Sequence, residues 1–298
     1  MQDVKEENNY KDFKERVLKE IENRVDGRVE IQKITKNNGL ELDGLTVLEE
    51  GINVSPTIYL NYYYDRFLEQ GMDVVVSDIL LKYKKYKSNV SIDISFFSDT
   101  EKVRDKIKMK LVNYERNKEL LKKVPYVEFL DLAILFYVEV ETRADEVATI
   151  LINNNHMKFW EFTIEDMFKL AETNMKNNFI IKSMSDILCD LMSEEYTEFE
   201  QEINVEMYIL TNCMKMQGAI GMLRKDILNG FMEKCHTKQL VIIPSSIHEV
   251  LLIPCDSEKD ISSYNEMVQE VNATQLQTEE VLSDNAYIYD GSEIKIIE

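Results

Sequence analysis

The residues best suited to chemistry lie near the end of the chain, in the stretch LVIIPSSIHEVLLIPC that begins at residue 240. Ser245, Ser246 and His248 bring hydroxyl groups and an imidazole within four residues, and such groups are the nucleophile and general base of many hydrolases. Alternate side chains of a strand share a face, so Ser246 and His248 could meet, whereas His248 and Glu249 could not. The stretch therefore allows one contact of a catalytic triad, for which no third member is evident.

Two prolines favour a structural interpretation of the same stretch. Pro244 and Pro254 flank it, and proline is tolerated at the ends of strands but not in their middle. We therefore predict strands at 239–243 and 248–254, joined by a turn in which the serine hydroxyls bond to nearby backbone. The G-x-S-x-G elbow of hydrolases is absent. A structural or ligand-contacting His248 is the alternative to a catalytic one.

A second histidine follows a run of three asparagines. Asn155 and His156 come directly after a predicted strand at 147–152, and loops at strand ends often contact ligands. If this strand and strand 248–254 lay in one sheet, His156 and His248 could approach each other. Two histidines with a carboxylate can bind a metal ion, but no H-E-x-x-H or Asp-rich spacing supports such a site here.

The cysteines point to free thiols. They lie about twenty residues apart and include no C-x-x-C pair, as is typical of a protein in a reducing compartment. We predict no metal and no cofactor, and we leave the catalytic residues unknown. The candidate functional residues are Asn155, His156, Ser245, Ser246 and His248.

Two further segments are candidates for binding sites. GAIGML at 218–223 lacks the pattern of a phosphate-binding loop, so its glycines indicate close backbone packing in a strand-like run. In NYYYDRF at 61–67, three adjacent tyrosines would point around nearly the whole circumference of a helix. At least one should therefore be exposed and could contact a partner, while core packing explains the others.

The chain of 298 residues carries a formal net charge of −20. Such a surface repels phosphate backbones and anionic lipids, so we expect neither direct nucleic-acid binding nor membrane binding. The N-terminus lacks the apolar core of a signal peptide, and no run approaches the ~18 apolar residues needed to cross a bilayer. These features predict a cytoplasmic protein. The acidic stretch between 183 and 214 is expected to be a solvated loop or, alternatively, a functional acidic patch.

The expected fold class is α+β, with two α+β domains divided near Pro125. The N-terminal domain, 1–123, should contain a helix at 9–25, a hairpin around Asn37-Asn38-Gly39, an edge strand carrying Pro56, two helices before residue 88, a strand at 91–97 and a helix at 99–122. The C-terminal domain, 124–298, should contain a mostly antiparallel sheet packed by helices. Its expected strands are 127–140, 147–152, 207–212, 217–223, 239–243, 248–254 and a closing hairpin after residue 285. Its expected helices lie near 163–176, 184–193, 224–236 and 256–271.

Six segments carry a family resemblance: NNGLELDGL, NVSPTIYLN, VPYVEFLDLAILFYVEV, ATILINNNHMKFW, IPSSIHEVLLIP and VNATQLQTEEVLSDNAYIYD. The chain resembles the bacterial domain-of-unknown-function family numbered 5688 over nearly its whole length. The SSIHEV segment and the closing VLSD-x-x-Y-x-Y pattern are the most specific parts. The resemblance implies a cytosolic protein of anaerobic Gram-positive bacteria, often encoded on mobile elements. It implies no activity, cofactor or catalytic residue.

These observations predict a non-enzymatic protein-binding or accessory factor with a protein partner. The rival prediction is a small hydrolase or ligand-binding enzyme that uses Ser246 and His248. A third is an acidic protein that mimics DNA toward a DNA-binding partner.

Overall fold

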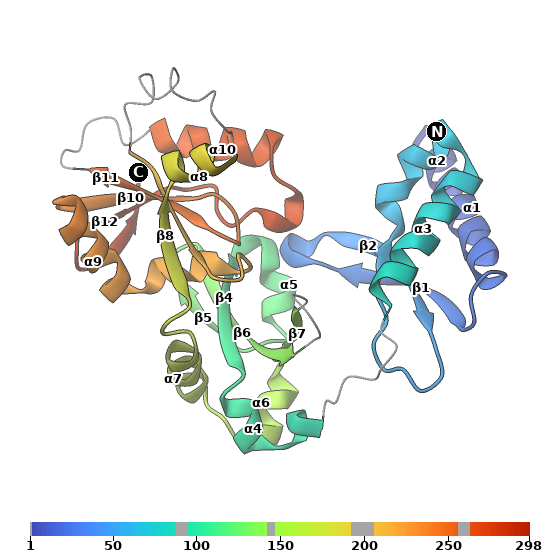
Figure 1. Ribbon diagram of the computed structural model, residues 1–298, viewed down its shortest axis with the longest axis horizontal. Helices are drawn as coiled ribbons and strands as arrows, with labels where there is room; N and C mark the ends of the chain where they lie inside the picture. The colour runs from blue at the N-terminus through green and yellow to red at the C-terminus, as the bar shows by residue number, and fades with distance from the viewer. Residues whose placement is uncertain (1, 88–94, 142–146, 192–205, 256–262) are drawn as a thin grey trace. The chain divides into compact units, whose positions relative to one another are not determined.

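The computed structural model describes residues 2–87, 95–141, 147–191, 206–255 and 263–298 (Figure 1). By contacts between Cα atoms the chain divides into two compact units, residues 1–36 with 40–95 and residues 37–39 with 96–298. Both units combine antiparallel sheets with helices, so the predicted α+β fold class is confirmed. Among the described residues, no helix combines the length and apolar composition needed to cross a membrane.

The first unit is a small sheet with helices packed on it. Its strands pair in the order β1-β2-β3, all antiparallel. The elements are α1 (Gln2–Glu22), β1 (Arg28–Thr35), η1 (Asn37–Gly39, counted with the second unit), β2 (Glu41–Leu48), β3 (Ile58–Tyr59), η2 (Leu60–Tyr63), α2 (Tyr64–Gln70) and α3 (Met72–Tyr86). The predicted helix at 9–25, the hairpin, the short edge strand and the two helices before residue 88 are confirmed.

The core of the first unit follows the helical period of the sequence. Phe13, Val17 and Ile21 recur at intervals of four residues on α1 and are all buried. They pack with apolar side chains of the sheet and of α3, where Val75 and Val76 are fully buried. The spacing that predicts these helices is therefore the spacing of the side chains that the core covers.

The predicted helix at 99–122 is wrong. The segment forms α4 (Thr100–Arg104), β4 (Ile107–Asn113), η4 (Glu115–Asn117) and α5 (Lys118–Leu121). In IKMKLV, Ile107, Met109 and Leu111 are buried while the lysines between them are partly exposed, which is the period of a strand. The lysines favour a helix locally, and tertiary pairing overrides them. Most of the strand predicted at 91–97 lies outside the described residues, and Ser95–Ser98 form η3.

A four-stranded antiparallel sheet opens the second unit. It consists of β4, β5 (Tyr126–Phe129), β6 (Leu132–Glu141) and β7 (Val147–Leu151), with β6 pairing to all three others. The single strand predicted at 127–140 is wrong, because Leu130 adopts a left-handed φ of 55° and Asp131 turns the chain between β5 and β6. The expectation of a central strand covered on both faces is confirmed for β6. Since β4 precedes Pro125 and pairs with β6, the division between the units differs from the boundary predicted there.

A six-stranded antiparallel sheet completes the second unit, in the order β13-β12-β10-β11-β9-β8. Its strands are β8 (Phe179–Ser183), β9 (Tyr208–Asn212), β10 (Gln239–Pro244), β11 (Val250–Cys255), β12 (Tyr287–Tyr289) and β13 (Ile294–Ile296). The other elements are α6 (Asn154–Trp160), α7 (Ile164–Asn174), α8 (Met184–Leu191), η6 (Gly218–Leu223), α9 (Lys225–Cys235), α10 (Ser263–Thr274) and η7 (Thr278–Glu280). Helices α9 and α10 pack on opposite faces of this sheet (Figure 1). The predicted mostly antiparallel sheet with helices is confirmed.

The strand predicted at 217–223 is wrong, since η6 occupies these residues. Its glycines nevertheless lie where the backbone packs closely, as the sequence indicates. A Cβ atom on Gly221 would lie 2.8 Å from the Phe179 ring, and one on Gly218 would lie 2.4 Å from the Thr211 hydroxyl. The predicted close backbone packing is therefore confirmed, in a 3-10 helix instead of a strand.

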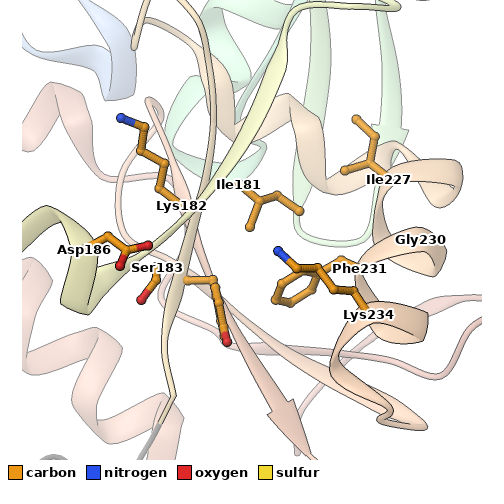
Figure 2. Close-up of a pocket in the computed structure, with 9 residues that line it drawn as sticks. Ile181, Lys182, Ser183, Asp186, Ile227, Gly230, Phe231 and Lys234 are labelled. Carbon is orange, nitrogen blue, oxygen red and sulfur yellow. The ribbon is translucent and has the colours of Figure 1, made fainter.

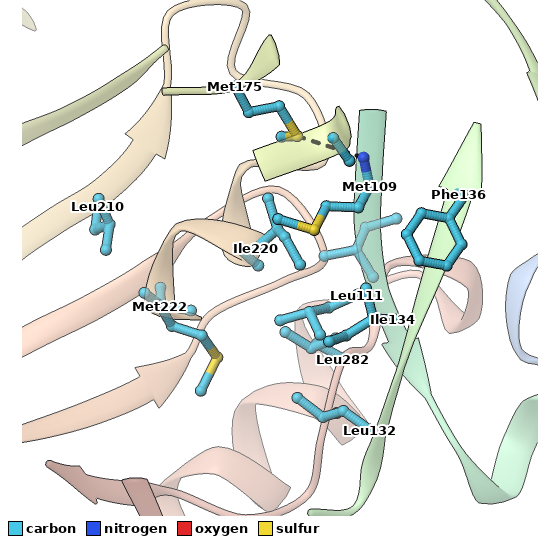
Figure 3. Close-up of a cluster of buried hydrophobic side chains, with 14 of the residues drawn as sticks. Met109, Leu111, Leu132, Ile134, Phe136, Met175, Leu210, Ile220, Met222 and Leu282 are labelled. Carbon is cyan, nitrogen blue, oxygen red and sulfur yellow. Dashed lines mark hydrogen bonds between the residues drawn. The ribbon is translucent and has the colours of Figure 1, made fainter. Parts of the chain in front are cut away.

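One hydrophobic core joins the two sheets. Met109, Leu111 and Ile134 of the four-stranded sheet pack in the same cluster as Leu210 of the six-stranded sheet and Ile220 of η6 (Figure 3). Apolar side chains of α7 and α9 complete this cluster. The two sheets of the second unit therefore share one apolar core.

A half-buried carboxylate adds a polar link between the sheets. Asp131, in the β5–β6 turn, accepts hydrogen bonds from Tyr287 (2.8 Å), Ser283 (2.6 Å) and Asn285 (3.1 Å). Burial, reinforced by the Asp131 charge, raises the pKa of the fully buried Tyr287 well above its usual value, so its phenol stays a donor. We name these four residues the Asp131 cluster.

Candidate functional site

The stretch with the serines and His248 forms the predicted hairpin. Strands β10 and β11 pair from Gln239 opposite Cys255 to Pro244 opposite Val250, and residues 245–249 connect them. Ser246 is buried and Ser245 is half-buried in this connection. The backbone N–H of Ser246 donates to the carbonyl of Glu249 at 3.2 Å. The two strands and the serine-bearing turn are therefore confirmed.

The hydroxyl of Ser246 and the imidazole of His248 have separate partners. Ser246 Oγ accepts a hydrogen bond from the backbone N–H of His248 at 3.0 Å, as in many serine turns. The His248 Nδ1 atom accepts a hydrogen bond from the backbone N–H of Gln217 at 3.2 Å. The His248 carbonyl accepts one from the Thr211 hydroxyl at 2.8 Å. The structure thus brings Ser246 to His248, but through the histidine backbone and not through its ring.

Asn155 and His156 lie at the start of α6, where the sequence was interpreted as a loop. Asn153 caps this helix, because its Oδ1 accepts from the N–H groups of Asn155 (2.9 Å) and His156 (3.0 Å). His156 Nδ1 in return accepts from the backbone N–H of Asn153 at 3.2 Å. This reciprocal pair is a capping box in which histidine takes the usual place of Glu or Gln. The loop interpretation is wrong because asparagine is a preferred N-cap residue.

The His156 ring packs against aromatic side chains. Its centroid lies 4.9 Å from that of Phe97, edge to face, and 5.6 Å from that of Trp160. Burial lowers the pKa of His156 below its usual 6.5. The strand that leads to His156 is in the four-stranded sheet, whereas His248 follows a strand of the six-stranded sheet. The single-sheet arrangement that could have brought the two histidines together is therefore not formed.

The Gln217 N–H that donates to His248 belongs to a loop rich in sulfur, which connects β9 to η6. Residues 213–217 read Cys-Met-Lys-Met-Gln, and we name them the sulfur loop. Asn212 closes the loop, because its Nδ2 donates to the Met216 carbonyl (2.6 Å) and its Oδ1 accepts from the Met216 N–H (3.2 Å). The Lys215 N–H donates to the Asn212 carbonyl and the Cys213 N–H to the Asn178 carbonyl. The loop backbone is therefore fixed at several points.

The end of the sulfur loop is set by His248 and Gly218. Lys215 and Gln217 adopt left-handed φ values of 53° and 56°, a conformation that costs a non-glycine residue about 1–2 kcal/mol. The Gln217–His248 hydrogen bond helps to hold that conformation. A Cβ atom on Gly218 would lie 2.5 Å from the His248 carbonyl oxygen. The β10–β11 turn and the sulfur loop are thus in direct backbone contact, with no room for a larger residue.

A cavity of about 220 Å³ lies beneath the sulfur loop. Its lining combines Tyr137 and Met175 with polar side chains that include the ion pair of Lys108 and Glu139. Burial, with a smaller contribution from Glu139, raises the pKa of Tyr137. The Gln217 Oε1 atom is buried and accepts no hydrogen bond from the described residues. The wall of the cavity therefore keeps one acceptor that a bound molecule could use.

A second, more open pocket of about 500 Å³ lies where α9 meets the edge strand β8 (Figure 2). Ile181, Ile227 and Phe231 form its apolar wall, and Lys182 and Asp186 stand at its rim (Figure 2). Ser183 is committed to a 2.5 Å hydrogen bond with the Ser185 hydroxyl. Among the described side chains of this pocket, no nucleophile is hydrogen-bonded to a general base.

The first unit exposes large apolar side chains. Leu81 and Leu68 are 67% and 63% exposed, and Tyr62 and Val74 are also exposed. Val74 and Leu81 are seven residues apart on α3, so they lie on one face of the helix. Of the adjacent tyrosines, Tyr62 is exposed and Tyr63 is buried, which confirms that at least one faces solvent.

Nearly the whole chain matches one family profile. The profile is described as a family of unknown function, DUF5688, and it covers residues 10–291. The protein belongs to this family. Neither the curated proteins nor the solved structures contain a match to this DUF5688 chain. The family resemblance seen in the sequence is therefore confirmed, and it brings no activity with it.

Two landmarks of the DUF5688 resemblance meet in the fold. The segment VPYVEFLDLAILFYVEV supplies Asp131, and the closing VLSDNAYIYD supplies Ser283, Asn285 and Tyr287. The SSIHEV landmark supports the sulfur loop through His248. The sulfur loop is not among the sites predicted from the sequence, where Cys213 stands only as one of the free thiols. The signal that could have found it is Cys-Met-x-Met, three sulfur side chains in four residues.

Proposed function

We propose that this DUF5688 protein is a non-enzymatic binding protein of the bacterial cytoplasm that contacts a partner protein through the first unit. It would act as an accessory factor, for example of a mobile element. The observation that carries the proposal is the exposure of Leu68, Val74 and Leu81 on helices α2 and α3. Large aliphatic side chains in water are unfavourable, and a partner that covers them gains roughly 25 cal/mol per Å² of apolar area.

The serine–histidine hydrolase receives less support from the geometry. A hydrolase needs the imidazole to accept the hydroxyl proton of the serine. Here Ser246 is buried and its oxygen accepts from the His248 backbone, while the imidazole Nδ1 is used by Gln217. Both side chains are committed to holding a turn and a loop. Their arrangement supports a positioning role and not nucleophilic attack.

The test compares two double variants in the native bacterium. Leu68→Ser/Leu81→Ser removes apolar side chains that are exposed in the first unit, and Leu130→Ser/Phe159→Ser removes exposed ones in the second unit as a matched control. Affinity purification with quantitative mass spectrometry should recover one protein in stoichiometric amount with the wild type and the control. The same protein should be lost with the first variant, because central apolar contacts often contribute 1 kcal/mol or more to binding.

Calorimetry with the purified partner then checks that the contact is direct. The expected weakening for Leu68→Ser/Leu81→Ser is at least about 10-fold. Equal binding by all three proteins would reject the first unit as the contact surface. If the partner binds DNA and a DNA duplex displaces it competitively from the wild-type protein, the DNA-mimic prediction would replace the proposal.

A further inference from the structure

We infer that the sulfur loop binds a soft monovalent metal ion, copper(I), through the sulfur atoms of Cys213, Met214 and Met216. This inference is independent of the partner proposed for the first unit, since it concerns different residues. It departs from the sequence-based prediction that the protein binds no metal.

The chemistry of the donor atoms selects the ion. Thiolate and thioether sulfurs are soft ligands that prefer copper(I), whereas borderline ions such as zinc take combinations of Cys, His and carboxylates. Among the described residues, no three His, Cys, Asp or Glu side chains cluster so as to hold a metal ion. Three sulfur side chains within four residues therefore favour a soft ion over zinc or a hard cation.

The exposure of these side chains is unusual for their type. Met214 is 49% exposed, Met216 is 45% exposed and Cys213 is exposed, although methionine and cysteine are among the residues most often buried. Other methionines of the unit, such as Met109 and Met175, are almost fully buried. An exposed group of thioethers at the mouth of a cavity is thus a feature that core packing does not explain.

Met175 is part of the cavity wall and is not one of the ligands. Its sulfur accepts a hydrogen bond from the backbone N–H of Met109 at 3.3 Å (Figure 3). The sulfurs of the loop side chains are instead carried on a backbone that is already fixed. Asn212 closes the loop at Met216, and His248 holds its far end at Gln217. A site whose backbone is ordered in advance loses less conformational freedom when the ion binds.

The charges near the site are compatible with a monovalent cation, since the Cys213 thiolate would offset the ammonium of Lys215 in the same loop. The ammonium of Lys108, which lines the cavity, is paired with Glu139. The chain as a whole carries −20, which raises the local concentration of cations. On binding, the Cys213 thiol would release its proton to water and its thiolate would bond to copper, leaving a neutral copper–thiolate unit with two thioether ligands. Copper enters and stays as copper(I), so no oxidant or reductant is required.

The test titrates the reduced full-length protein with copper(I) under anaerobic conditions, in competition with a chromophoric copper(I) chelator. The wild type should withdraw one equivalent of copper from the chelator. Cys213→Ser and Met214→Leu/Met216→Leu should each weaken binding by at least about 100-fold, since even the outer partners of a metal site contribute 10–100-fold. Leucine keeps the volume of methionine, so the fold should be unaffected.

The matched control is Cys235→Ser/Met267→Leu, which removes a thiol and a 46%-exposed thioether elsewhere in the unit. It should bind copper as the wild type does. Silver(I), a redox-inert probe, should shift the NMR signals of the Met214 and Met216 methyl groups and leave that of Met267 unchanged. Failure of the wild type to withdraw copper, or equal affinity of the site variants and the wild type, would overturn the inference. The second result would assign the copper to other thiols and leave the exposed methionines as an apolar docking surface.

Discussion

The Asp131 cluster and the sulfur loop are two polar constructions of the same unit, and they use their hydrogen bonds in opposite ways. In the Asp131 cluster, three side-chain donors converge on a half-buried carboxylate. In the sulfur loop, the hydrogen bonds are made mostly to the backbone, and the side chains of Met214 and Met216 face solvent. The first arrangement links two sheets through side chains, whereas the second fixes a backbone and leaves its side chains exposed.

Removing the carboxylate of the Asp131 cluster should have the largest effect. Asp131→Ala would leave the phenol of the buried Tyr287 without its acceptor, and Ser283 would keep only its 3.3 Å bond to the Asn285 carbonyl. We expect a loss of about 2–4 kcal/mol in the free energy of unfolding, measured by urea denaturation. Glu165→Ala is the control, since the Glu165–Lys169 pair is exposed and should contribute little. Equal losses would contradict the difference between a carboxylate that accepts from a buried phenol and an exposed one.

Gly218→Ala tests whether the backbone at the end of the sulfur loop is packed as closely as the structure indicates. The new methyl group would meet the Thr211 hydroxyl at 2.4 Å and backbone atoms at 2.5 and 2.6 Å, so we expect destabilisation by about 1–3 kcal/mol. Gly230→Ala is the opposite case, because no atom lies within 4 Å of the added Cβ on α9. That variant should stabilise the protein by up to about 1 kcal/mol, since alanine favours the helix. Thermal denaturation of both variants gives the sign directly.

His248 substitutions sharpen the distinction between a positioning residue and a core residue. His248→Ala removes the acceptor of the Gln217 N–H, and copper(I) affinity should fall about 10-fold. His248→Asn places an amide oxygen near the position of Nδ1 and should restore most of that affinity. His248→Gln moves the acceptor farther along the side chain and should not. Equal affinity of the alanine and asparagine variants in the chelator competition would show that this hydrogen bond does not position the loop.

His156 belongs to neither region and should have the smallest effect. Because burial lowers its pKa below 6.5, the unfolded chain takes up the proton more readily than the folded one. The free energy of unfolding should therefore fall as pH drops below about 6.5. His156→Gln retains a capping box and removes the titration, so its stability should match the wild type at pH 8 and decline less toward pH 5. Parallel pH profiles for the two proteins would contradict the assignment.

Periodic patterns predicted most of the fold, and local conflicts account for the errors. The α1 face of Phe13, Val17 and Ile21 and the proline-bounded hairpin at 239–255 were predictable because one spacing dominates each. The 99–122 segment was not, since the helix-favouring lysines of β4 alternate with core side chains whose pairing with β6 decides the outcome. In the 127–140 segment, a continuous apolar run concealed the turn at Asp131, whose donors come from residues more than 150 positions away.

The hairpin that carries Ser246 and His248 was predictable, but the contacts of these residues were not. Strand alternation would allow the two side chains to share a face, yet both residues lie in the connection between β10 and β11, where the serine oxygen accepts from the histidine backbone. The partner of the imidazole, Gln217, lies 31 residues earlier in the chain and reaches His248 only because β9 pairs with β11. The strands that lead to His156 and His248 ended in different sheets for the same reason: strand order is set by the whole sheet and not by the local sequence.

The bond between Tyr287 and Asp131 spans 156 residues, and this separation has a consequence during synthesis. At about 5–20 residues per second, a ribosome needs roughly ten to thirty seconds to add that length of chain. Throughout that time the Asp131 carboxylate lacks the Tyr287 donor, and β10, once made, lacks its neighbour β12 until residues 287–289 follow. The nascent second unit should thus be open to proteases and chaperones until its last strands emerge, and ribosome-bound chains that stop short of residue 287 should be cleaved far faster than the released protein.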